Sequence, residues 1–114
     1  MQITIIDDSG TTARVVLNGK LDISGAEKIA LPLATLAGGK RGVLVDMAAV
    51  TFIASIGIRH LVMAGKALSR RGGRLVLLNP NALVTDVPTT SGVLELMTIA
   101  NSDAEAAAAL GPQA

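Results

Sequence analysis

Hydrophobic positions along the chain fall into short runs separated by segments rich in glycine, proline and polar residues. Residues 2–6 and 14–19 are typical of two strands joined by a turn-rich loop. Nearly continuous apolar runs at 42–47, 74–79 and 94–99 predict three more strands. The run at 42–47 should form a central strand buried on both faces. It is expected to end at Asp46, with the carboxylate hydrogen-bonding the following loop.

A helical spacing of apolar positions follows the second predicted strand, within residues 21–39. Ser24 followed by Glu27 fits a capping box, and Gly38 and Gly39 should end this helix. Pro32 lies too deep to be a first-turn proline, so we expect it to kink or split the helix.

A second amphipathic helix is predicted from about Ile56 to Arg70, ended by glycines at 72 and 73. A short third helix should begin near Pro80. A last helix should begin at Ser102, with Glu105 completing a capping box.

The alternation of strands and helices predicts an α/β fold with a mostly parallel sheet of about five strands and about four helices packed on it. A length of 114 residues favours one domain over 1–114, with a core at about 2–110 and a tail at 111–114. Half of the residues are hydrophobic and Phe52 is the only aromatic one, so the core must consist of aliphatic side chains and methionine.

Composition argues against several functional classes. The chain has no cysteine, which removes disulfides, thiolate metal sites and cysteine nucleophiles. The net charge is +1, and the densest basic stretch, RRGGR at 70–74, is expected to be a solvated turn, which argues against nucleic-acid binding. Neither a secretory signal nor a membrane-spanning stretch is evident, so we expect a cytoplasmic protein without membrane insertion.

Enzymatic motifs are also missing. A serine nucleophile elbow needs glycine two residues before the serine, where this chain has Ile53. His60, the single histidine, follows Ser55 by five residues, which rotates it about 140° around a helix and away from the serine. No phosphate-binding loop or metal-ligand cluster is present in the sequence, so we expect neither an enzyme nor a cofactor.

Ser55 stands where a strand gives way to the second helix, and two interpretations remain open. It is either an N-cap whose hydroxyl accepts a first-turn amide, or a phosphate acceptor at a helix start that favours negative charge. Ile56, in the first turn, offers an apolar anchor for a partner. Asp22, which closes the second strand, would lie beside Ser55 if the two strand ends are neighbours in the sheet.

The segments LNGKLDISGAEKI and VLVDMAAVTFIASIGIRHLVMAGKALSRRGGRLVLLNP resemble the STAS family, which includes bacterial anti-sigma factor antagonists. The resemblance covers about residues 2–110. It implies a partner-binding domain without catalysis, in which a serine at the helix start is phosphorylated by a serine-kinase anti-sigma factor and dephosphorylated by a separate phosphatase. Ser55 matches the phosphoacceptor, and Asp22 matches the strand-end aspartate that assists partner contact.

The family motif is commonly Asp-Ser-Ser-Gly or Asp-Ser-Thr-Gly, whereas this chain has Ala-Ser-Ile-Gly at 54–57. The preceding carboxylate and the second hydroxyl are therefore both missing. An alternative implied by the resemblance is a non-switching subunit of a larger assembly, such as a lipid-transport ATPase or a stress-signalling complex. In either case the predicted partner-binding residues are Asp22, Ser24, Ala54, Ile56, Gly57 and Arg59.

Overall fold

The computed structural model describes residues 2–6, 11–79, 97–100, 102 and 104–105. Its elements, in chain order, are β1 (Gln2–Ile6), β2 (Thr12–Leu21), α1 (Ile23–Gly39), β3 (Gly42–Ile53), α2 (Ser55–Arg70), β4 (Arg74–Leu78) and β5 (Met97–Ala100).

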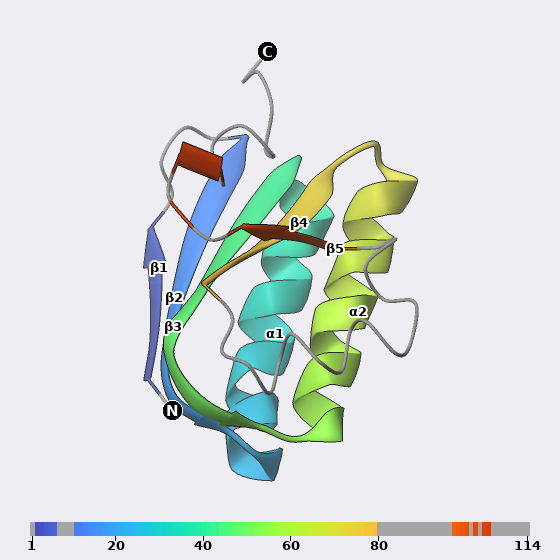
Figure 1. The fold of residues 1–114 in the computed structure, drawn as a ribbon. Helices are drawn as coiled ribbons and strands as arrows, with labels where there is room; N and C mark the ends of the chain where they lie inside the picture. Colours follow the sequence, from blue (N-terminus) through green and yellow to red (C-terminus); the bar gives the residue numbers. More distant parts are fainter. Residues whose placement is uncertain (1, 7–10, 80–96, 101, 103, 106–114) are drawn as a thin grey trace.

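The strands form one mixed sheet in the order β1-β2-β3-β4-β5. β1 pairs with β2 antiparallel, and the other three neighbouring pairs are parallel. Figure 1 shows α1 and α2 side by side on one face of this sheet. The α/β class expected from the sequence is therefore correct. The predicted third helix lies outside the described residues, as does most of the last one. At the start of the last helix, the Glu105 amide donates to Ser102 Oγ at 3.2 Å, as the capping box predicts.

The core lies between the sheet and the two helices. Alternating residues of β2 and β3 point toward the helices, and they pack with aliphatic residues of α1 and α2. Each fully buried leucine or valine contributes about 1.5–3 kcal/mol to folding. A smaller apolar cluster occupies the opposite face of the sheet, on β3, β4 and β5, which explains why β3 and β4 are continuously apolar. It contains Leu44, Val76, Leu78 and Ala100.

Strand β3 is longer than its apolar run suggests, and Asp46 does not end it. The carboxylate of Asp46 accepts from Arg14 of the neighbouring β2 at 3.1 Å and from the Ala48 amide at 3.1 Å. The strand continues to Ile53, and these bonds satisfy the carboxylate within it.

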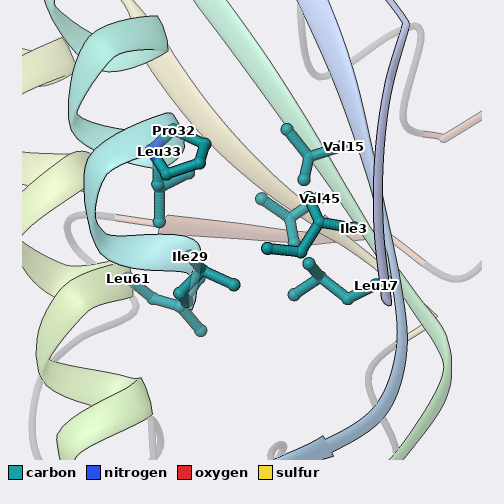
Figure 2. Close-up of a pocket in the computed structure, with 8 residues that line it drawn as sticks. All are labelled: Ile3, Val15, Leu17, Ile29, Pro32, Leu33, Val45 and Leu61. Atoms are coloured by element: carbon teal, nitrogen blue, oxygen red, sulfur yellow. The ribbon is translucent and has the colours of Figure 1, made fainter. Parts of the chain in front are cut away.

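Helix α1 passes through Pro32 without splitting. Eight apolar residues around this turn line a cavity of about 10 Å³ between α1, α2 and the sheet (Figure 2). Proline lacks the amide that would close a helical hydrogen bond, and its ring excludes the usual close fit to the preceding turn. Of the expected kink or split, the split is wrong, because α1 is continuous from Ile23 to Gly39, and Pro32 is accommodated beside a small gap in packing.

Candidate functional site

The site is built where the ends of β2 and β3 meet. Leu21 pairs with Ile53 in the parallel register, and the Ala54 amide donates to the Leu21 carbonyl at 2.8 Å. In Figure 1 the end of β2 leads into α1, and the end of β3 curves beneath α1 toward the start of α2. Asp22 directly follows β2, and Ser55 follows β3 after Ala54, so the paired strand ends bring the starts of both helices to one end of the sheet. This pairing meets the condition under which the sequence places Asp22 near Ser55.

Asp22 is the N-cap of α1. Its Oδ1 accepts from the Gly25 amide at 2.9 Å, and its residue is half-buried. The predicted cap at Ser24 is wrong, because α1 already begins at Ile23 and leaves Ser24 exposed in the first turn. Asp22 therefore has a structural role, which fixes its carboxylate at the edge of the site.

Ser55 is the first residue of α2, and Ala54 occupies the N-cap position without a side-chain hydrogen bond. Of the two interpretations of Ser55, the N-cap is thus excluded. The Gly57 and Ile58 amides donate to the Ala54 carbonyl at 3.0 and 3.2 Å. Ser55 is exposed, and within the described part of the chain its hydroxyl makes no hydrogen bond. Its oxygen is therefore accessible at the positive end of the helix dipole.

Gly57 explains how α2 can start so close to β2. A Cβ at this position would lie 2.6 Å from Leu21 Cγ and 3.3 Å from the Leu21 carbonyl oxygen. Real Cβ atoms essentially never lie within 3.0 Å of another such atom, so the contact with Leu21 Cγ requires glycine. Gly57 is buried and acts by positioning the helix, whereas Arg59 is exposed one turn after Ser55. Ile56 is half-buried, so it offers a partner only part of its side chain.

A shallow depression lies between the starts of the two helices. It is lined by Asp22, Ile23, Ser24, Glu27, Phe52 and Ala54. Ile23 is 66% exposed and Phe52 is 43% exposed. Neither residue is predicted as a site residue from the sequence. Phe52 is the single aromatic residue of the chain and lies just before the junction of β3 and α2, which is the sequence feature that could have identified it as a site residue. The exposure of Ile23 follows from its place as the first residue of α1.

The described residues contain no group of three or more histidine or acidic side chains that could hold a metal ion. His60 is half-buried on α2. Within the described ranges, no helix is long and apolar enough to span a membrane. The arrangement instead offers an exposed hydroxyl and exposed apolar side chains at one end of the sheet.

These features define a class of small α/β domain, in which a serine starts a helix beside a strand-end aspartate. The chain belongs to the STAS domain family, whose family model matches residues 4–106.

Its relatives include the Bordetella bronchiseptica protein BtrV, named for an inferred role as an anti-sigma factor antagonist. BtrV is 34% identical over 94 residues, which cover 82% of this chain and 81% of BtrV. Among solved structures, an anti-sigma factor antagonist (STAS) domain protein from Planctomyces limnophilus aligns with a TM-score of 0.81 and 20% identity, covering 96% of this chain and 97% of that one. The Bacillus cell fate determinant SpoIIAA in its phosphorylated form aligns with a TM-score of 0.75 and 23% identity, covering 90% and 95%. At these identities, the two structures establish likeness of fold.

Proposed function

We propose that this protein is an anti-sigma factor antagonist, which acts in the cytoplasm by binding a serine-kinase anti-sigma factor. In this proposal the kinase phosphorylates Ser55, and a phosphatase reverses the modification. The role inferred for BtrV, a relative over most of the chain, supports antagonist function. The observation that carries the phosphoacceptor role is the exposed Ser55 hydroxyl at the start of α2, beside the strand end that carries Asp22.

The chemistry requires little of this chain. The Ser55 oxygen attacks the γ-phosphorus of ATP held by the kinase, an O–P bond forms, and the bond to the leaving ADP breaks. The hydroxyl proton passes to a base of the kinase. The chain contributes accessibility and position, because the serine is held on a regular helix that Gly57 seats against Leu21.

A phosphate at Ser55 adds about −1.5 to −2 charges at neutral pH. The start of α2 favours negative charge there, so the domain itself should tolerate the phosphate. A partner that contacts the exposed Ser55 and the adjacent depression would instead meet a large charged group. Phosphorylation would therefore weaken binding without refolding the domain.

A second function is favoured by Ala54 and Ile56. These residues leave the site without the carboxylate and second hydroxyl that flank the phosphoacceptor in the usual motif. A permanent subunit of a larger assembly, such as a lipid-transport ATPase or a stress-signalling complex, would dock through the same surface and need no phosphate. In that case Ser55 would stay unmodified, and the partner would bind in constant stoichiometry.

The test is to purify the protein from its own host with partners attached and to map phosphate by mass spectrometry. We expect a co-purified kinase and a fraction of chains with phosphoserine at Ser55. Recovery of a transporter or a large assembly in fixed stoichiometry, with Ser55 unmodified in every sample, would contradict the switch and support the permanent subunit.

A further inference from the structure

The exposed side of α2 carries a line of cations. Arg59, Met63, Lys66 and Arg70 are all exposed, and intervals of four, three and four residues place them on one side of the helix. At 100° per residue they fall within about 60° of arc, and at 1.5 Å per residue they span about 16 Å. We call the three cations, Arg59, Lys66 and Arg70, the basic ridge, and Met63 lies along the same side of the helix.

The charge of this ridge is uncompensated within its helix, because α2 contains no acidic residue. Among the described residues, Arg59, Lys66 and Arg70 take part in no ion pair. The single described salt bridge, between Arg14 and Asp46, lies in the sheet. Three cations therefore face solvent in a row on a chain whose net charge is only +1.

A groove runs beside the ridge, between α1 and α2, which lie next to each other in Figure 1. Its lining consists mostly of small side chains, with His60 and Met63 on the α2 side: Ala30, Ala34, Ala37, Gly38, His60, Met63, Ala64 and Ala67. Met63 is 57% exposed, so a large apolar side chain stands between the groove and the cations. A ligand on this surface would meet apolar and positive groups along parallel lines.

We propose that the basic ridge and the groove dock an acidic amphipathic helix of the partner protein. The carboxylates of that helix would pair with Arg59, Lys66 and Arg70, while its apolar side chains enter the groove beside Met63. The identity of the partner rests on the proposed function: the anti-sigma factor is the protein that supplies the acidic helix.

Other anionic ligands fit the surface less well. Single-stranded nucleic acids are held by cationic grooves with aromatic residues for stacking, and α2 has no aromatic side chain other than that of His60. Membrane surfaces are bound by helices whose bulky apolar residues project, whereas the groove here is lined mainly by alanine and glycine. The row of cations next to a recess fits a protein helix best.

Ser55 lies on the same side of α2, one turn before Arg59. A phosphate on Ser55 would pair with Arg59 and place negative charge at the end of the ridge. It would thereby repel the carboxylates of the docked helix. The ridge thus gives the proposed modification a direct electrostatic effect on partner affinity.

The experiment measures binding of the full chain to a fluorescein-labelled 18-residue helical peptide by fluorescence anisotropy. The peptide carries glutamates at positions i, i+4 and i+11 and leucines on the adjacent side, and a control peptide has glutamine in place of glutamate. We expect the acidic peptide to bind, its affinity to fall between 50 and 200 mM salt, and the glutamine peptide to bind at least about threefold more weakly.

Lys66→Glu should weaken binding of the acidic peptide about fivefold, because it replaces the attraction between Lys66 and a peptide glutamate by a repulsion at an exposed position. Lys28→Glu is the matched control: it makes the same charge change at an exposed lysine of α1 outside the groove lining. It should change affinity by less than about twofold. Circular dichroism of both variants verifies folding.

Equal losses in Lys66→Glu and Lys28→Glu would overturn the proposal, because only net charge would matter. Preferential binding to a 20-base-pair DNA or to phosphatidylserine vesicles, without binding to the acidic peptide, would also overturn it. The assay contains no kinase, so its failure leaves the test of Ser55 phosphorylation intact. Conversely, an unmodified Ser55 in the host would not alter peptide binding.

Discussion

Replacing Gly57 by alanine should destabilise the domain and displace the start of α2. The new Cβ would lie 2.6 Å from Leu21 Cγ and 2.9 Å from Leu21 Cδ2. Leu21 has no solvent exposure, so its side chain has no open space into which it can move. The nearby Leu21 carbonyl accepts the Ala54 hydrogen bond, so a backbone shift would weaken the junction that holds Ser55.

Two opposing effects set the magnitude. Forcing a methyl group into a close-packed contact costs about 1–3 kcal/mol. Alanine is favoured over glycine inside a helix by about 0.8–1 kcal/mol, which offsets part of that cost. Since the clash is with the branch point of a fully buried leucine, we take the upper part of the cost range, about 2–3 kcal/mol, and expect a net loss of about 1–2 kcal/mol in the free energy of unfolding. For a domain of this size, this corresponds to a fall in Tm of about 5–10 °C.

Urea unfolding followed by far-UV circular dichroism is the appropriate assay, because the chain has no tryptophan or tyrosine to report by fluorescence. Gly38→Ala in α1 is the control, since its Cβ would have no atom within 4 Å, and it should be neutral or slightly stabilising. In a double-mutant cycle, Leu21→Ala should cost less in the Gly57→Ala background than alone. Wild-type stability of Gly57→Ala, or strict additivity in the cycle, would refute the steric argument.

Three further changes test other contacts. Asp22→Ala removes the side-chain cap of α1 and should lower the free energy of unfolding by about 1 kcal/mol, measured by urea denaturation. Leu61→Ala should cost about 2–5 kcal/mol, because the side chain is buried beside the existing cavity, whereas Leu31→Ala at a 75% exposed site should stay within about 0.5 kcal/mol of wild type. Arg71→Ala should lower Tm by several degrees, because the Arg71 guanidinium donates to the Ala37 and Lys40 carbonyls at 2.6 and 2.9 Å. An unchanged Tm would mean that solvent replaces these hydrogen bonds.

Local patterns predicted the elements well where burial and periodicity agree. Helix α2 begins within one residue of its predicted start, because its apolar positions face the core at regular spacing and glycines 72 and 73 follow it. Gly72 has a φ of +77°, and the Gly73 amide donates to the Leu68 carbonyl at 2.7 Å, which closes the end of the helix.

Predictions that depend on distant residues were less accurate. Asp46 resembled a strand end, since its partner Arg14 is 32 residues away in sequence. Ser24 and Asp22 are both good caps, and the choice between them depends on where the helix begins after β2, which places Asp22 at the N-cap. The requirement for Gly57 likewise arises from contact with Leu21, which no local pattern contains.

Asp22 was predicted to lie near Ser55 on the condition that the two strand ends are neighbours in the sheet. The parallel pairing of β2 with β3 meets this condition. The exposed Ile23 and Phe52 were missed because burial of an apolar residue cannot be inferred from its type alone. The fold was therefore more predictable than the surface around Ser55.

The most direct measurement of the central claim is the affinity of the co-purified anti-sigma factor for variants of Ser55, determined by calorimetry. Ser55→Asp should bind at least about tenfold more weakly than wild type, a loss of about 1.4 kcal/mol or more. Thr35→Asp, which places the same charge at an exposed residue of α1 outside the groove lining and the basic ridge, should bind within about twofold of wild type. Equal affinity of Ser55→Asp and wild type would contradict a phosphorylation switch at the start of α2.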